Sequence, residues 1–151
     1  MDSMVMEIAT ARFGPLPVEE DDVIHFPAGI VGLEECRRWV LLDNIHHDAT
    51  AWLQSVDRPE IALMVTSPRR FVPEFQLRVA RRELEPLALE SVAAAEVLTI
   101  VAKSEGTFML NLKAPLVIHP ERRLGRQVIA NGEAPIQYAL GSTPKRMRRS
   151  A

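Results

Sequence analysis

The stretch that decides the fold runs Val97-Leu98-Thr99-Ile100-Val101-Ala102, then Lys103-Ser104-Glu105-Gly106, then Thr107-Phe108-Met109-Leu110-Asn111-Leu112. Its first segment is rich in β-branched side chains and apolar on both faces, which is typical of a strand covered on both sides. The middle segment has the composition of a turn, and alternate residues of the last segment, from Phe108 onward, are apolar. We therefore expect a hairpin of two strands joined by a four-residue loop.

Short segments of the same kind recur on both sides of this hairpin. They are rich in β-branched and aromatic residues and are bounded by Pro, Gly and Asp. We expect strands at residues 4–8, 23–26, 39–42, 52–56, 61–66, 75–79, 116–119 and 127–130. Many short strands separated by turns predict an antiparallel sandwich or an antiparallel barrel.

The connections between these strands are short. Residues 57–60 and 120–126 have turn composition, and residues 14–22, rich in proline and acid, are expected to link the first two strands. Helix should be minor, because the 11 prolines interrupt most of the chain. The best helical candidates are residues 33–38, 79–84 and 89–95.

Charge is unevenly distributed along the 151 residues. The formal net charge is −2, but residues 145–151 contain four Lys or Arg side chains, so residues 1–144 carry −6. An acidic body argues against nucleic-acid binding by the folded domain, which would need a basic patch to neutralise phosphates, and it suits contact with basic or neutral protein surfaces. We expect one folded domain over residues 1–141 and a basic, disordered tail over residues 142–151.

Cysteine content and hydropathy indicate the compartment. The single cysteine, Cys36, cannot form an intrachain disulfide, and a reducing cytoplasm is the expected location. We expect neither a secretory signal nor a membrane span, because no stretch approaches the roughly 18 apolar residues that a bilayer requires.

Motifs for catalysis or cofactor binding are weak. Neighbouring residues on a strand point to opposite faces, so His46-His47-Asp48 is interpreted as a solvated loop rather than a metal site. Glu19-Glu20-Asp21-Asp22 lacks the alternation and the turn glycine of a calcium loop. Neither a Gly-x-Ser-x-Gly elbow nor a Gly-rich phosphate loop is present. We therefore expect no catalysis, no cofactor and no metal.

Five segments stand out by their local composition and follow one another in a fixed order. They are Phe26-Pro27-Ala28-Gly29-Ile30-Val31-Gly32-Leu33, Leu53-Gln54-Ser55-Val56-Asp57-Arg58-Pro59, Phe71-Val72-Pro73-Glu74-Phe75, Asn111-Leu112-Lys113-Ala114-Pro115-Leu116-Val117-Ile118 and Arg123-Leu124-Gly125-Arg126-Gln127. Together they resemble the FliW family of flagellar assembly factors, whose pattern runs Phe-x-x-Gly-Ile-x-Gly-Phe, Leu-Gln-Ser-x-Asp-x-Pro, Phe-x-Pro-Asp-Tyr, Asn-Leu-x-Ala-Pro-Ile-x-Ile-Asn and Arg-x-Gly-x-Gln. The resemblance extends over about residues 4–140.

The chain departs from this pattern at a few positions. Leu33 replaces an aromatic residue and Glu74-Phe75 replaces Asp-Tyr, and both changes keep similar chemistry. Val31 replaces the usual proline and His119 replaces asparagine, and both changes lie at positions where the side chain influences the geometry of a turn.

The resemblance implies a mainly β fold, a small antiparallel β-barrel-like single domain with one or two short helices. Members of the family bind flagellin in the cytoplasm and also bind the translational regulator CsrA. Abundant flagellin occupies FliW, so that CsrA represses flagellin translation. As flagellin is exported, FliW is released and captures CsrA without occupying its RNA site directly. The resemblance thus implies a partner switch with no enzymatic activity.

The candidate partner-binding residues are Gln54, Asp57, Phe71, Pro73, Phe75 and Asn111. Gln54 alternates with its neighbours along a strand and is expected to present its amide at the sheet surface. For Asp57, as for Pro59, building the hairpin turn is favoured over direct contact.

The remaining candidates lie near sheet edges and turns. Pro73 cannot donate a ladder hydrogen bond, so residues 71–75 are expected at an edge or in a loop, where Phe71 and Phe75 either form a partner groove or pack in the core. Asn111 either satisfies backbone groups near Ala114-Pro115 or meets a partner, and the structural role is favoured. Residues 123–127 are expected to form a turn with Gly125 at positive φ.

Two other hypotheses remain open. The chain could be a small β-barrel ligand-binding protein or an enzyme with a pocket at the barrel mouth, where Gln54, Asp57 and Asn111 would converge. Alternatively, residues 145–151 could bind RNA, with an affinity that falls steeply with salt.

Overall fold

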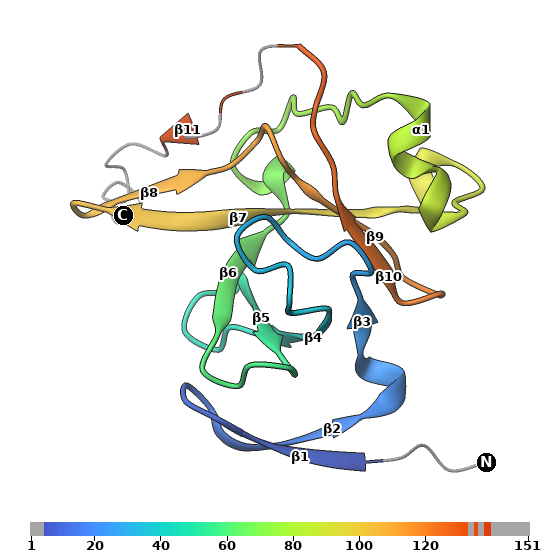
Figure 1. The fold of residues 1–151 in the computed structure, drawn as a ribbon. Helices are drawn as coiled ribbons and strands as arrows, with labels where there is room; N and C mark the ends of the chain where they lie inside the picture. The colour runs from blue at the N-terminus through green and yellow to red at the C-terminus, as the bar shows by residue number, and fades with distance from the viewer. Residues whose placement is uncertain (1–4, 133–134, 136–137, 140–151) are drawn as a thin grey trace.

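The computed structural model describes residues 5–132, residue 135 and residues 138–139, and Figure 1 shows its fold. Within these residues the strands are β1 (Val5–Thr10), β2 (Gly14–Glu19), β3 (Ile24–His25), β4 (Arg38–Asp43), β5 (Ala51–Ser55), β6 (Ala62–Thr66), β7 (Glu96–Ser104), β8 (Thr107–Leu110), β9 (Leu116–His119), β10 (Leu124–Gln127) and β11 (Tyr138–Ala139). The helical elements are α1 (Arg81–Leu84) and the 3-10 turns η1 (Glu20–Asp22), η2 (Pro68–Arg70), η3 (Glu85–Leu87) and η4 (Val92–Ala94). The protein is therefore mainly β, which confirms the expected fold class.

Seven of the strands close into a barrel. Their order is β7-β6-β5-β4-β3-β10-β9, and β9 returns to pair with β7. Of the two architectures that the strand pattern allowed, the structure is thus the barrel. The described barrel pairs are antiparallel except for β3 and β10, where a single parallel bridge joins His25 to Leu124. The expected tail, residues 142–151, lies outside the described residues, so the boundary at residue 141 stays a prediction.

Strand β7 closes the barrel because it changes partners along its length. Residues Glu96 to Leu98 pair with β9, Thr99 and Ile100 pair with β6, and residues 101–104 pair with β8. The long horizontal strand in Figure 1 therefore belongs to the barrel at one end and, at the other, to the extension formed with β8 and β11. Leu98 and Thr99, near the middle of the apolar run, are buried, whereas Ala102 and Lys103 in the extension are exposed.

The β7–β8 hairpin confirms the expected pair of strands but not the expected loop. Ser104 pairs with Thr107, so the loop holds two residues rather than four. The loop residues Glu105 and Gly106 have φ of 52° and 80°, and two positive φ values in succession are the mark of a type I′ hairpin turn. Such a turn matches the twist of the flanking strands, which therefore continue further than turn composition suggests.

A separate hairpin, β1–β2, covers one side of the barrel. Residues 14–22 were expected to be a link, but Gly14–Glu19 is a strand paired with β1 in regular register. The prolines at 15 and 17 are compatible with a strand here because β2 is an edge strand, whose outer side needs no N–H donors. Ile8 and Val18 from the hairpin pack with Val40 and Val56 of the barrel wall.

Three further expectations differ from the structure. Residues 75–79 are extended and alternate between half-buried apolar and exposed polar side chains, but no strand is assigned to them. The strand expected at 127–130 lies earlier, at Leu124–Gln127. Residues 33–38 contain a hydrogen-bonded turn rather than a helix, whereas the candidates at 79–84 and 89–95 do contain α1 and η4.

The barrel interior is filled by large apolar side chains. The cluster includes Ile24, Phe26, Ile30, Cys36, Trp39, Leu53, Val65, Leu98, Leu116 and Ile118, all of which are buried. The interior of this small barrel is thus a core of packed side chains. Among the described residues, no helix is long and apolar enough to cross a membrane.

Candidate functional site

Gln54 is buried, which contradicts the expectation that its amide lies at the sheet surface. Its side chain is 0% exposed, because the β1–β2 hairpin covers the face of the sheet on which its cross-strand neighbour Val40 lies. The amide nitrogen donates to the carbonyl oxygens of Ser55 (2.9 Å), Pro59 (3.0 Å) and Ile61 (3.1 Å). Gln54 therefore holds the chain together at the β5–β6 turn.

Asp57 connects this turn to the start of β4. One carboxylate oxygen accepts hydrogen bonds from the backbone nitrogens of Arg37 (2.8 Å) and Arg38 (2.9 Å), and the other accepts from Nε of Arg38 (2.8 Å). Partial burial opposes the ionised form, but these backbone and guanidinium hydrogen bonds outweigh it and hold the pKa of Asp57 below its usual value. Asp57 was expected to build its own hairpin turn, but its carboxylate instead binds the start of the neighbouring strand β4.

Asn111 stabilises the loop after β8. Its side-chain oxygen accepts hydrogen bonds from the backbone nitrogens of Lys113 (3.1 Å) and Ala114 (3.0 Å), which is an Asx-type turn leading into Pro115. The favoured structural reading of Asn111 agrees with this geometry. Gln54, Asp57 and Asn111 bond to three separate sets of backbone groups and form no shared polar cluster of the kind that the barrel-mouth pocket hypothesis needs.

Three of the five unusual segments meet around β10. Gly125 lies in this strand, where a Cβ atom would stand 2.4 Å from Cζ of Phe26, so glycine is required by close packing. The expectation of a turn with Gly125 at positive φ is wrong, because the positive φ, 54°, belongs to Arg123. The Gln127 side chain accepts from the Val31 nitrogen (2.8 Å) and donates to the Ala114 oxygen (3.1 Å). The contacts among these three segments therefore stabilise the barrel fold.

The segment with Phe71, Pro73 and Phe75 is a loop without an assigned strand, as expected. Phe71 and Phe75 are half-buried and pack against a cluster of Val72, Leu110 and Leu112, while Pro73 is exposed. Phe75 also lines a hollow of about 400 Å³ together with Pro68, Arg69, Leu77, Val92, Ala93, Ala95 and Val97 among others. Of the candidate residues, Phe75 is thus the one that combines core packing with a concave surface.

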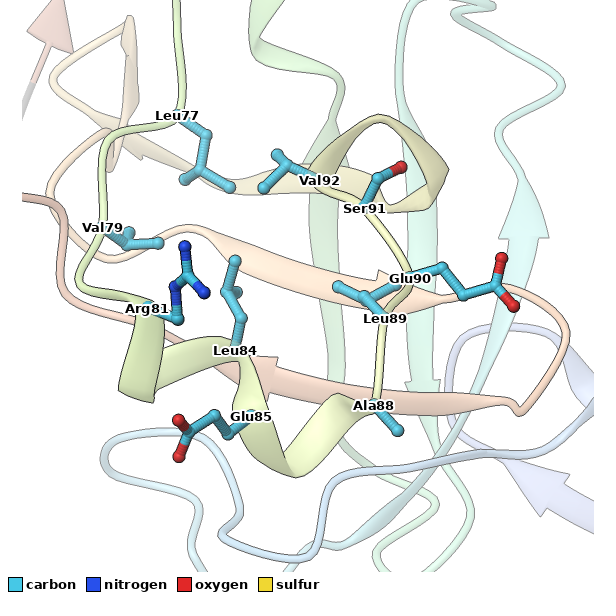
Figure 2. A pocket seen from close by; sticks show the side chains of 10 residues that line it. All are labelled: Leu77, Val79, Arg81, Leu84, Glu85, Ala88, Leu89, Glu90, Ser91 and Val92. Carbon is cyan, nitrogen blue, oxygen red and sulfur yellow. The ribbon is translucent and has the colours of Figure 1, made fainter.

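A larger hollow of about 680 Å³ lies beside it and shares Leu77 and Val92. Figure 2 shows that its walls come from the extended segment after residue 76, from α1 with η3, and from the chain leading to η4. Its lining is Leu77, Val79, Arg81, Leu84, Glu85, Ala88, Leu89, Glu90, Ser91 and Val92. A concave, mainly apolar surface with a few charged groups is the usual form of a binding site.

Sequence reasoning missed this hollow because none of its lining residues belongs to a conspicuous motif. The signal that was available is the apolar alternation at residues 75–79, together with two short helical candidates on either side of Pro86. Apolar residues that alternate without a strand partner must be covered by something else. Within the described residues, no group of three or more His, Cys, Asp or Glu side chains is arranged to hold a metal ion.

Comparison with known proteins gives a consistent result over nearly the whole chain. Residues 7–140 match the protein family described as FliW protein. The flagellar assembly factor FliW of Natranaerobius thermophilus is 32% identical over 127 residues, which cover 82% of this chain and 84% of that protein. The FliW of Geotalea uraniireducens is 35% identical over 130 residues, which cover 85% of this chain and 79% of that protein.

A solved structure agrees with the sequence comparison. The crystal structure of a flagellar assembly factor FliW superposes with a TM-score of 0.82 at 29% identity, covering 89% of this chain and 96% of that one. The fold, the contacts among the segments that meet around β10 and the related proteins together define a small β-barrel protein of flagellar assembly. More particularly, the chain belongs to the FliW family of flagellar assembly factors.

Proposed function

We propose that this protein binds flagellin and CsrA in the cytoplasm and couples flagellin translation to flagellin export. The observation that carries the proposal is the family match over residues 7–140, which spans every strand of the barrel. The protein acts as a partner switch: flagellin holds it while flagellin is abundant, and CsrA takes its place when flagellin has been exported. CsrA held in this way no longer represses flagellin translation.

Mass action sets how sharp such a switch is. With CsrA at a concentration equal to its Kd, about half of the protein carries CsrA when flagellin is absent. If flagellin competes at ten times its own Kd, the share that carries CsrA falls to about one twelfth. A roughly sixfold change in captured CsrA therefore needs no conformational change and no catalysis.

Charge supports the CsrA half of the proposal. Residues 1–144 carry −6, and an acidic surface attracts a basic RNA-binding protein while it repels the RNA phosphates. Direct nucleic-acid binding by the barrel is therefore not part of the proposed function. The role of the basic residues 145–151 stays open, and they lie outside the described part of the chain.

Binding rather than catalysis is also supported by the use of polar side chains. The amide nitrogen of Gln54, the carboxylate of Asp57 and the side-chain oxygen of Asn111 all bond to backbone groups. A reaction at a barrel mouth would need such groups free and convergent. Their commitment to architecture favours a role that depends on the outer surface.

Gel filtration of the purified protein mixed with its cognate flagellin, and separately with its cognate CsrA, tests the proposal. We expect a co-eluting complex with each partner at micromolar concentrations. Truncation at residue 141 serves as a control, because binding that depends only on the basic tail would be lost on truncation and weakened steeply by salt. Failure to bind both partners would overturn the proposed function.

A further inference from the structure

The β1–β2 hairpin directs a row of backbone groups outward from β1. Ala9 of β1 is paired with Pro15 of β2, and two residues earlier Glu7 is paired with Pro17. Proline has no N–H, so neither pair can be a hydrogen-bonded pair of the ladder. Because hydrogen-bonded and non-hydrogen-bonded pairs alternate in an antiparallel ladder, the N–H and C=O groups of Val5, Glu7 and Ala9 point away from β2.

The two outer edges of the hairpin differ in whether they can accept another strand. On the outer edge of β2, Pro15 and Pro17 offer no donor, and the N–H of Glu19 already donates to the Asp22 carboxylate (3.4 Å). The outer edge of β1 lies at the margin of the molecule in Figure 1, and within the described residues no strand pairs with it. The β1 edge is therefore open and the β2 edge is closed.

The open edge is short and exposed. Val5, Glu7 and Ala9 are all exposed, and the edge ends at Ala11, whose N–H donates to the backbone oxygen of Pro59 (3.2 Å). An extended segment of about five residues would match its length. Addition of such a segment to an exposed sheet edge is a common mode of peptide recognition, in which main-chain hydrogen bonds supply much of the affinity.

Carboxylates dominate the charge around this edge. They belong to the hairpin and to η1, which follows β2, and are Glu7, Glu19, Glu20, Asp21 and Asp22. Cations also approach. Arg12 lies over a tryptophan ring at the hairpin tip, and Arg123 donates to the backbone oxygen of Asp22 (3.0 Å). Arg38 is neutralised by its ion pair with Asp57 (2.8 Å), so carboxylates outnumber the remaining cations.

These features select the chemistry of an occupant. The open edge selects an extended chain, and the acidic surroundings favour Lys or Arg side chains on it. A second copy of this protein fits poorly, because two-fold pairing of the whole edge would place Glu7 opposite its own counterpart. We propose that a basic, extended segment of CsrA adds to β1 as a third strand, with a Lys or Arg beside Glu7. This inference rests on the proposed function, in which CsrA, as an RNA-binding protein, is the basic partner.

A proline placed on the open edge tests the strand addition. Ala9→Pro removes an outward N–H and spares the β1–β2 ladder, because β2 itself carries a proline at the paired position. Ala9→Val is the matched control, since valine is similar in size and keeps the N–H. Isothermal titration with purified cognate CsrA gives the readout, and circular dichroism checks the fold. We expect Ala9→Pro to weaken CsrA binding about tenfold or more and Ala9→Val to leave it within about twofold, with flagellin binding unchanged in both.

A charge reversal tests the position of the basic side chain. Glu7→Lys reverses the charge at the centre of the edge, and Glu105→Lys makes the same change in net charge at an exposed position in the β7–β8 loop. Both side chains are exposed, so this pair remains informative if Ala9→Pro does not fold. We expect Glu7→Lys to weaken CsrA binding about fivefold or more at low salt, and Glu105→Lys to leave it within about twofold.

The possible outcomes separate the two levels of the proposal. If wild-type protein binds CsrA, but the Ala9→Pro and Glu7→Lys variants bind it as their controls do, the strand addition is refuted while the proposed function stands. Equal losses for Glu7→Lys and Glu105→Lys would mean that net charge alone matters, and this also refutes it. A folded Ala9→Pro variant that loses flagellin, or a wild-type dimer that Ala9→Pro dissociates, would refute CsrA as the occupant. Wild-type protein that binds neither partner would overturn the proposed function and, with it, this inference.

Discussion

Substituting Gly125 by alanine should destabilise the barrel through one identifiable contact. A Cβ atom at this position would stand 2.4 Å from Cζ, 2.6 Å from Cε1 and 2.8 Å from Cε2 of Phe26. Carbon atoms in favourable contact are about 3.5–4.0 Å apart, so the ring must retreat by about 1 Å. Phe26 is 0% exposed and packed in the barrel interior, which leaves no free space for that movement.

The expected loss of stability follows from this overpacking. Inserting a methyl group into a filled core destabilises a protein by about 1–3 kcal/mol. For a domain of this size, each kcal/mol lowers Tm by about 2–4 °C, so Gly125→Ala should unfold roughly 2–12 °C below wild type. Urea denaturation followed by circular dichroism, together with a thermal scan, measures both quantities.

A second substitution isolates the contact between Gly125 and Phe26. Phe26→Leu alone removes buried atoms and should destabilise by about 1–2 kcal/mol. In the Gly125→Ala background the same change also relieves the clash, so the double variant should be more stable than the sum predicts by about 1 kcal/mol or more. Strict additivity, or a Gly125→Ala variant as stable as wild type, would refute the packing explanation.

Two other predictions concern the polar side chains that hold the turns. Asp57→Asn should lower the free energy of unfolding at pH 7 by about 1–3 kcal/mol in urea titrations. Because the folded-state pKa of Asp57 lies below its unfolded value of about 3.9, its stabilisation is fully present above that pH and is lost as the pH falls through the folded pKa. The stability gap between wild type and Asp57→Asn should therefore shrink in titrations repeated below about pH 4, and a gap that grows there would contradict the assignment. Asn111→Ala should destabilise by about 1–2 kcal/mol in the same assay, whereas Asn111→Asp, which keeps the accepting oxygen, should lose less; equal losses would exclude the Asx-type turn as the cause.

The sequence was sufficient for most strands, because each carries a local apolar pattern. It was insufficient where the secondary structure of a segment depends on whether another strand pairs with it. Residues 75–79 alternate as a strand does, but within the described residues no strand pairs with them, and Leu77 and Val79 line the hollow instead. Residues 14–19 contain two prolines that argue against a strand, yet they form one because β2 is an edge.

The candidate site shows the same division between local and tertiary information. Asn111 lies three residues or fewer from the groups it binds, and the favoured reading from sequence agrees with its contacts. The burial of Gln54 depends on the β1–β2 hairpin more than thirty residues earlier, which alternation within β5 does not encode. Gly125 is a glycine because of Phe26, about a hundred residues away, and not because of its own backbone angles.

Competition between the two proposed partners tests the central claim most directly. CsrA is titrated into the protein by calorimetry, first alone and then with flagellin held well above its own Kd. The partner switch predicts that each partner binds by itself and that flagellin weakens the apparent affinity for CsrA in proportion to its excess. An affinity for CsrA that flagellin leaves unchanged, or the absence of binding by both proteins, would contradict the account.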